Sequence, residues 1–172
     1  MAGAVAGFLF WWYATPVYND AIGAASVQIL QMDKRLCGPR ADSVDRNLFV
    51  QPRLCLVPTA TIPADQLTYN IILLAALFAM GGRRVLAFII SYLVVITTHI
   101  LSFAVSIEST YANANGTWSE QHYSAFERQL WISTEFFWRL VGMFAIVFAC
   151  WWIAQQQKES LSHRERVARS AG

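Results

Sequence analysis

Four apolar stretches dominate the pattern of hydrophobic and polar positions along the chain. A helix that crosses a bilayer needs about 20 mostly apolar residues, because each residue advances about 1.5 Å through about 30 Å of hydrocarbon. The pattern predicts membrane-spanning helices at residues 2–19, 66–81, 85–107 and 130–154. The stretch at 85–107 carries no formal charge and gives the clearest signal. The predicted fold is an all-α integral membrane protein with four transmembrane helices.

The longest polar segment, residues 33–65, contains two β-prone runs at 47–51 and 54–57 with Pro52 beside them. Short apolar runs bounded by proline and glycine are typical of strands. The segment is too small to be an independent domain. We therefore expect a small β-prone extracytoplasmic segment between the first and second spans, lying over the outer ends of the helices.

Three further polar stretches follow along the chain. Residues 81–84, Gly-Gly-Arg-Arg, interrupt the apolar run, and arginine is costly in lipid, so the pattern predicts a turn outside the membrane. Residues 108–128 form a second outer segment whose aromatic side chains are typical of interfacial anchors. A polar tail at 155–172 follows the last span. The whole chain is predicted to be a single membrane domain.

Composition supports a membrane protein and excludes one other class. The 172 residues are 56% hydrophobic and only 14% charged, which is more apolar surface than a soluble domain of this size buries. We expect membrane lipid as a partner. The net charge of +2, with dispersed basic residues, excludes a nucleic-acid partner bound through a stripe of phosphate contacts. Trp11-Trp12-Tyr13 in the middle of the first stretch, with no basic region before it, favours an uncleaved anchor over a signal peptide.

Basic residues and cysteines indicate the orientation. Basic side chains are denser in the turn and tail than in the outer segments, although the raw numbers are equal, so both termini are predicted to be cytoplasmic. Cys37 and Cys55 lie 18 positions apart in the first outer segment. A disulfide between them would require an oxidising compartment, in agreement with that orientation. Two unrelated reduced thiols are the alternative.

Several polar side chains lie inside the predicted spans. Counting inward from the outer helix ends places His99 level with Arg139, and Ser102 level with Glu135. A charge left alone in lipid costs several kcal/mol, so these groups are expected to face one another inside the bundle. The predicted polar intramembrane cluster consists of Asn70, His99, Ser102, Glu135 and Arg139.

Two interpretations of this cluster remain open. It is either a binding or proton-handling site in the outer half of the membrane, or an internal ion pair with hydrogen-bond partners that fixes helix packing. The second is favoured, because neither metal-ligand spacing nor coupled carboxylates accompany the cluster. We predict no catalytic residues, metal or cofactor. Thiol catalysis is disfavoured because His99 and Cys150 lie at different depths, and a hydrolase using His99 and Glu135 is the least favoured class.

The layout resembles a known family. The aromatic first span "FLFWWYATPVYNDAIG", the second span "TYNIILLAALFAMGGRR" and the segment "FERQLW" before the last span resemble the exosortase H-associated membrane proteins, over nearly the whole chain. Paired cysteines in the outer segment depart from that family. The resemblance implies a non-enzymatic accessory in the bacterial cytoplasmic (inner) membrane that contacts an exosortase-like protease or its client. The alternative is a small structural subunit of a larger respiratory, secretory or transport complex.

Overall fold

The computed structural model describes residues 2–44, 46–53, 57–81 and 85–170. Its helical elements are α1 (Ala2–Leu30), the 3-10 turn η1 (Lys34–Leu36), α2 (Asp65–Thr68), α3 (Asn70–Gly81), α4 (Val85–Asn113), α5 (Thr117–His122), α6 (Ala125–Phe137), the π-helix η2 (Trp138–Gly142) and α7 (Met143–Ser170). Its strands are β1 (Pro39–Val44), β2 (Asn47–Pro52) and β3 (Ala60–Pro63). The protein is therefore mostly helical with one small sheet, which confirms the helical part of the predicted fold.

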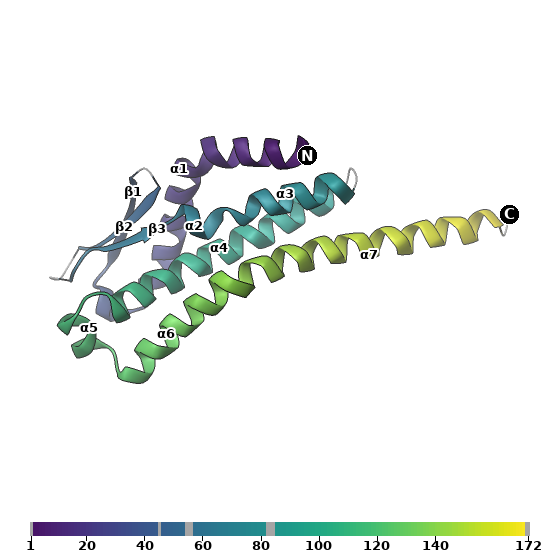
Figure 1. The fold of residues 1–172 in the computed structure, drawn as a ribbon. Helices are drawn as coiled ribbons and strands as arrows, with labels where there is room; N and C mark the ends of the chain where they lie inside the picture. Colours follow the sequence, from purple (N-terminus) through teal and green to yellow (C-terminus); the bar gives the residue numbers. More distant parts are fainter. Residues whose placement is uncertain (1, 45, 54–56, 82–84, 171–172) are drawn as a thin grey trace.

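Helix α1 is bent, and its two parts pack against different elements (Figure 1). Pro16 lies inside the helix and removes one backbone donor, which is a common cause of a kink. The first part runs beside α3, where the Cβ of Ala75 lies 2.8 Å from the position a Cβ on Gly7 would take. The second part runs under the sheet and ends at Leu30. The helix thus continues well beyond residue 19, where the predicted first span ends.

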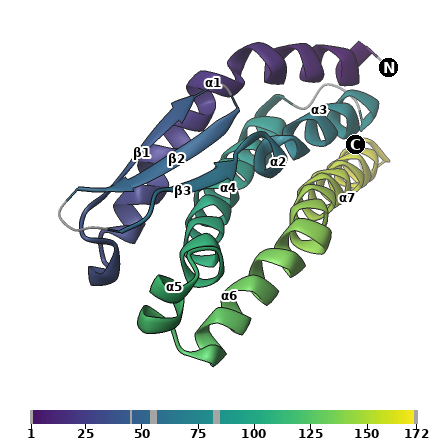
Figure 2. The ribbon, with the colours of Figure 1, turned by 60° about the vertical axis from the view of Figure 1, so that its left-hand side comes forward.

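The three strands form an antiparallel sheet in the order β1-β2-β3. Leu48, Val50 and Ile62 are fully or almost fully buried and belong to one core with residues of α1 and α4. Figure 2 shows the sheet lying across the second part of α1. We call η1 and the three strands the sheet lobe. It packs on the helices and shares their core instead of having a separate one.

The sheet differs in part from the predicted pair of strands. The run at 47–51 is a strand, as predicted, and forms β2. Of the second run, residues 54–56 lie outside the described residues and Val57 is not in a strand. The strands that flank β2, β1 and β3, were not predicted. β1 has the sequence Pro-Arg-Ala-Asp-Ser-Val and exposes alternate residues at the sheet edge, so it carries no apolar periodicity.

α6, η2 and α7 follow one another as a single long rod beside α4 (Figures 1 and 2). The rod begins with a capping box. Ser124 Oγ accepts a hydrogen bond from the backbone N–H of Glu127, 3.2 Å away, and Glu127 Oε2 accepts one from the backbone N–H of Ser124, 2.8 Å away. α1 begins and α7 ends on the same side of the molecule, away from the sheet and α5.

Among the described residues, two helices are long and apolar enough to cross a membrane: Val85–Asn113 and Ala125–Gln157. They contain the predicted third and fourth spans. The apolar helix at Asp65–Met80 is shorter than a span requires, and α1 is not among the candidate spans found in the described residues. The four-span topology therefore remains a prediction. Residues 82–84 of the predicted turn lie outside the described residues, but α3 ends at Gly81 and α4 begins at Val85.

Candidate functional site

Two of the five residues of the predicted polar cluster meet in a chain of hydrogen bonds centred on His99. The imidazole is fully buried, with Nε2 2.5 Å from Asn70 Oδ1 and Nδ1 2.7 Å from the Tyr18 hydroxyl oxygen. The amide nitrogen of Asn70 donates to the backbone carbonyl of Met143, 3.4 Å away. This chain of hydrogen bonds contains one group from each of the helices α1, α3, α4 and α7.

The direction of these bonds assigns the proton on His99. An amide oxygen can only accept, so Nε2 carries the proton and donates it to Asn70 Oδ1. Nδ1 is then an acceptor for the Tyr18 hydroxyl. Both ring nitrogens of a neutral imidazole are satisfied in this way, as is usual for buried polar groups. The arrangement therefore ties four helices together.

Glu135 and Arg139 form a second, separate group. Glu135 Oε1 lies 2.6 Å from an Arg139 terminal nitrogen and accepts a hydrogen bond of 2.7 Å from the Ser106 hydroxyl. The guanidinium also donates to Ser106 Oγ and to Gln66 Oε1 of α2, each 3.2 Å away. A charge in the apolar part of a helix bundle needs such partners. The ion pair of α6 and η2 thus contacts α4 through Ser106 and α2 through Gln66, rather than through His99.

Ser102 joins neither group. Its side chain is buried, and its hydroxyl oxygen has no hydrogen-bond partner among the described residues. The same holds for both amide atoms of Asn19, which is fully buried. The place predicted for Ser102 opposite Glu135 is taken by Ser106, one helical turn further along α4. Both outer helix ends lie further out than predicted, since α4 runs to Asn113 rather than to 107 and α6 begins at Ala125 rather than at 130. These two shifts nearly cancel, so the offset of one turn comes from how the two helices are placed against each other.

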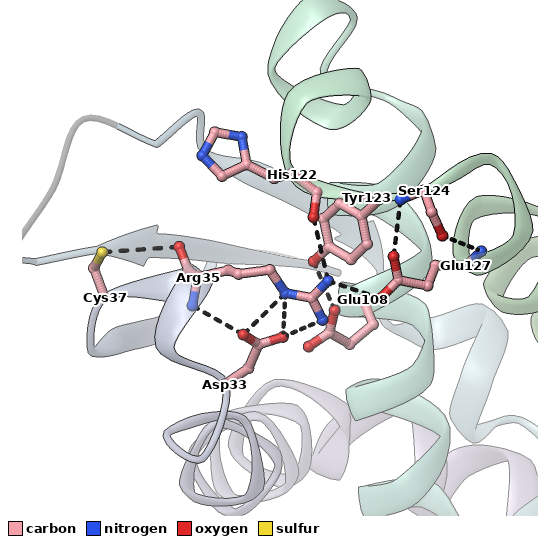
Figure 3. A network of polar contacts seen from close by, with 8 residues as sticks. All are labelled: Asp33, Arg35, Cys37, Glu108, His122, Tyr123, Ser124 and Glu127. Carbon is pink, nitrogen blue, oxygen red and sulfur yellow. Dashed lines mark hydrogen bonds and ion pairs between the residues drawn. The ribbon is translucent and has the colours of Figure 1, made fainter.

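A third polar network, which sequence reasoning missed, joins the sheet lobe to the α5–α6 connection (Figure 3). Arg35 of η1 is at its centre. Its guanidinium donates to Asp33 through Nε and one terminal nitrogen, at 2.9 Å and 2.7 Å, and to Glu127 Oε1 at 3.3 Å. It also lies over the Tyr123 ring, 4.2 Å from the centroid.

Glu108 of α4 completes this network. Glu108 is 5% exposed, and its carboxyl group accepts a hydrogen bond from the Tyr123 hydroxyl, 2.7 Å away. Burial, followed by the nearby Glu108 carboxyl, raises the pKa of Tyr123 above its ordinary value, so this hydroxyl stays a donor. Burial alone would also raise the pKa of Asp33, but hydrogen bonds from Arg35 outweigh it and hold this pKa below its ordinary value. The sequence contains one signal for part of this network: Ser124-x-x-Glu127 is the spacing of a capping box.

An apolar groove opens beside this network, between α1, α4 and α6. Its volume is about 520 Å³. Ile29 and Leu30 of α1, Leu101, Ala104 and Val105 of α4, and Trp131 of α6 line its apolar part, while Asp33, Arg35 and Glu108 line its charged end. We call it the α1–α4–α6 groove. It reaches the surface, because Leu101 is 52% and Ile29 is 41% exposed.

The remaining candidate groups are the cysteines and side chains that could hold a metal ion. Cys37 follows η1, and Cys55 lies outside the described residues, so the Cys37–Cys55 disulfide remains a prediction. Cys150 of α7 is a free cysteine. Among the described residues, no group of three or more histidine, cysteine or acidic side chains is placed to hold a metal ion.

The comparisons with known proteins return no relative. No protein-family model, curated protein or solved structure matches the chain. The fold and site define a mostly helical protein with a sheet lobe, two helices fit to cross a membrane, and polar groups paired between helices.

Proposed function

We propose that the chain is a non-enzymatic accessory of a bacterial exosortase-type sorting system. It crosses the inner membrane four times with both termini in the cytoplasm. It contacts the sorting protease or its client through the sheet lobe and the outer half of the helix bundle. The resemblance of the first, second and last spans to the exosortase H-associated membrane proteins motivates this assignment.

The firm attachment of the sheet lobe is the observation that carries the proposal. The Tyr111 hydroxyl of α4 donates to the backbone carbonyl of Val50 across 3.0 Å, and both residues are fully buried. Asp20 of α1 accepts from the backbone N–H of Ser43, 3.0 Å away. A lobe held this way presents a preorganised surface, which lowers the entropic cost of binding a partner.

The pairing of the polar groups also favours a binding protein. His99 is engaged by Tyr18 and Asn70, and Glu135 by Arg139 and Ser106. A general base must lie within hydrogen-bond reach of the proton it removes, and these groups are directed at each other. The arrangement supports the interpretation that they fix how the helices pack.

Site-specific photocrosslinking in the native bacterium tests the proposal. A photoreactive residue is placed at Val44 of the sheet lobe or at Phe126 of α6, which is 75% exposed. The control position is Leu86, which is 72% exposed and lies at the start of α4, the end of that helix far from α5. We expect a crosslink to an exosortase-like protease or its client from Val44 or Phe126 and none from Leu86. Crosslinks to such proteins from Leu86 alone would contradict the proposal.

One observation favours the alternative of a subunit in a larger membrane complex. Phe136, Phe137 and Trp152 of the α6–α7 rod are 63%, 64% and 59% exposed, and aromatic side chains are enriched at protein interfaces. Gentle extraction followed by size analysis separates the two functions. Stoichiometric co-purification with respiratory, secretory or transport subunits would favour the alternative over the accessory role.

A further inference from the structure

One side of the β1 backbone faces away from the rest of the sheet. β1 is an outer strand, and it lies beside the second part of α1 (Figure 2). In an antiparallel pair, alternate residues direct their N–H and C=O groups to the neighbouring strand, and the residues in between direct them away. Ser43 donates its N–H to Asp20 of α1, so it is one of the residues directed away from β2. Ala41 and Pro39, two and four positions earlier, therefore have the same direction.

The middle of this edge is open. Asp20 covers the end at Ser43, and Pro39 at the other end has no N–H. The N–H of Ala41 has no hydrogen-bond partner among the described residues. A sheet edge with unpaired backbone groups is a template for another extended chain. The edge of β1 thus offers one N–H, that of Ala41, and the two carbonyl groups of Ala41 and Pro39.

A groove runs along the open part of the edge. It lies between Gly38–Ala41 and one face of α1, which includes Ala24, Gln28 and Gln31, and its volume is about 460 Å³. We call it the α1–β1 groove. Four strand residues extend over about 10 Å, which leaves a cross-section of roughly 46 Å².

This cross-section matches an extended chain. A chain in a sheet occupies roughly 48 Å², because strands lie about 4.8 Å apart and packed sheets about 10 Å apart. A helix about 10 Å across needs roughly 80 Å². The α1–β1 groove is therefore wide enough for a strand and too narrow for a helix.

The polar lining of the α1–β1 groove is cationic. Its described lining contains the guanidinium groups of Arg40 and Arg53 and no carboxyl group. Arg40 donates to Asp42 through Nε, and its terminal nitrogens have no partner among the described residues. The side chains of Arg53 and Gln28 have neither an ion pair nor a hydrogen bond with another described residue. An acidic group is the complement of this lining, because guanidinium donates most strongly to carboxylates.

We infer that the α1–β1 groove binds a short extended peptide segment, which adds to the sheet as a strand beside β1 and carries an acidic side chain. The backbone of the segment bonds to the open groups of Ala41 and Pro39. The side chain opposite Ala41 is apolar and points to the inner face, where Val27 lines the groove. The adjacent side chain lies opposite Arg40 on the exposed face, where a carboxylate reaches the guanidinium. Backbone bonds supply affinity, and the side chains supply selectivity.

The position of the groove makes it accessible to a water-soluble segment of a partner. Its lining residues lie between 24 and 53, after the first proposed span and before the second. In the proposed topology the groove is therefore outside the hydrocarbon. The inference rests on the proposed function, because the groove belongs in part to the sheet lobe that is proposed to contact a protease or its client.

Peptide binding to the full-length chain in a neutral detergent tests the inference. The probe is a fluorescent eight-residue peptide of alternating valine and glutamate with blocked ends. One control peptide has lysine in place of glutamate, and a second has methylated backbone nitrogens that cannot donate to the carbonyl groups of β1. Fluorescence anisotropy is expected to show at least tenfold tighter binding of the probe than of either control. The probe is also expected to slow hydrogen exchange of the Ala41 amide, measured at single-residue resolution.

Variants of the chain locate the binding site. Ala41→Pro removes the open N–H and no hydrogen bond to β2, since proline is tolerated where an edge N–H faces away from the sheet. It is expected to weaken probe binding at least tenfold. Arg53→Glu is expected to weaken probe binding at least fivefold and to strengthen binding of the lysine peptide. Lys34→Gln removes an exposed cation outside the groove lining and is expected to change neither affinity. Unchanged hydrogen exchange of the β2 amides shows that a variant keeps the sheet.

Three results would overturn the inference. They are equal affinities for the glutamate and lysine peptides, probe binding unchanged in both Ala41→Pro and Arg53→Glu, and displacement of the probe by phosphatidylglycerol micelles without any protection of the Ala41 amide. The third result would assign the groove to an anionic headgroup.

Failure of the inference is distinguishable from failure of the proposed function. Absence of probe binding together with crosslinks to a sorting protease or its client from Val44 or Phe126 would remove the inference and leave the proposed function standing. Probe binding that depends on Ala41, together with such crosslinks from Leu86 alone, would support strand addition and contradict the proposed function.

Discussion

His99 Nε2 donates a hydrogen bond to Asn70 Oδ1 across 2.5 Å, and both side chains are fully buried. The bond joins α4 to the first residue of α3. Because Asn70 also donates to the carbonyl of Met143, the first residue of α7, the pair acts on three helices at once. The buried donors and acceptors satisfy one another, so removing one of them leaves another without a partner.

A double-mutant cycle on this pair is expected to show coupling. Asn70→Leu leaves the His99 N–H unpaired and removes the side-chain hydrogen bond to the Met143 carbonyl, at a cost of about 1–3 kcal/mol. His99→Leu leaves Asn70 Oδ1 and the Tyr18 hydroxyl unpaired. The double variant should lose less stability than the sum of the two single losses, by on the order of 1 kcal/mol. Thermal unfolding in detergent measures the four proteins, with Thr97→Val at an exposed α4 position as the control. Strict additivity would contradict the bond.

Glu135 is 18% and Arg139 is 30% exposed, and both bond to the Ser106 hydroxyl, so this ion pair should stabilise the fold more than a fully exposed one does. Glu135→Gln or Arg139→Met alone leaves the partner without its counter-charge, and each is expected to lower the free energy of unfolding by on the order of 1 to 2 kcal/mol. The double variant should recover part of that loss. The comparison pair, Arg40 and Asp42 of β1, is 56% and 49% exposed, and its loss is expected to cost less than about 1 kcal/mol. Equal losses for the two pairs would mean that Glu135 and Arg139 are solvated.

Much of the helical fold was predictable, because apolar runs of helix length are a local signal. The end of α3 at Gly81, the start of α4 at Val85 and the strand β2 followed from residues close to each other in the chain. The i, i+4 spacing of Glu135 and Arg139 likewise predicted their contact. Helix ends were less predictable. α1 and α4 both run beyond the apolar stretch, because helical hydrogen bonding continues into residues that pack against the sheet lobe.

The partners of the polar residues were less predictable because they are far apart in sequence. Tyr18 and His99 are separated by 81 positions, and Arg35 and Glu127 by 92. No periodic pattern reports such contacts. Tyr18 lies at the end of an aromatic stretch that predicted a membrane anchor and indicated no partner for the hydroxyl. Its contact with His99 depends on the bend of α1 and on how that helix packs against α4.

The Asp33–Arg35 contact predicts a pH dependence of stability. Hydrogen bonds from Arg35 hold the folded-state pKa of Asp33 below its ordinary value. A carboxyl with a lowered folded-state pKa contributes stability above its unfolded pKa, about 3.9, and loses it as the pH falls through the folded-state value. Wild type should therefore exceed Asp33→Asn in stability at neutral pH, and this difference should shrink below about pH 4.

Partial exposure of Asp33 and Arg35 keeps the effect small, on the order of 1 kcal/mol. Chemical unfolding at a series of pH values measures it. Asp42→Asn is the matched control, because its pair with Arg40 lies on the exposed edge of the sheet. A stability difference for Asp33→Asn that grows as the pH falls would have the wrong sign for a carboxylate held by Arg35.

Tyr111→Phe should loosen the sheet lobe without unfolding the helices. The change removes only the hydroxyl that donates to the Val50 carbonyl, and the ring remains in the core with Leu48 and Ile107. The Val50 carbonyl then has one hydrogen bond fewer in a buried setting, at a cost of about 1–2 kcal/mol. Because β2 is the central strand, hydrogen exchange of its backbone amides is expected to speed up by roughly tenfold, while exchange in α4 stays the same. Tyr13→Phe, at a residue 80% exposed on α1, is the control. Unchanged exchange in β2 would mean that the apolar core alone holds the sheet lobe in place. The preorganised surface of the proposed accessory would then depend on the packing of Leu48, Val50 and Ile62.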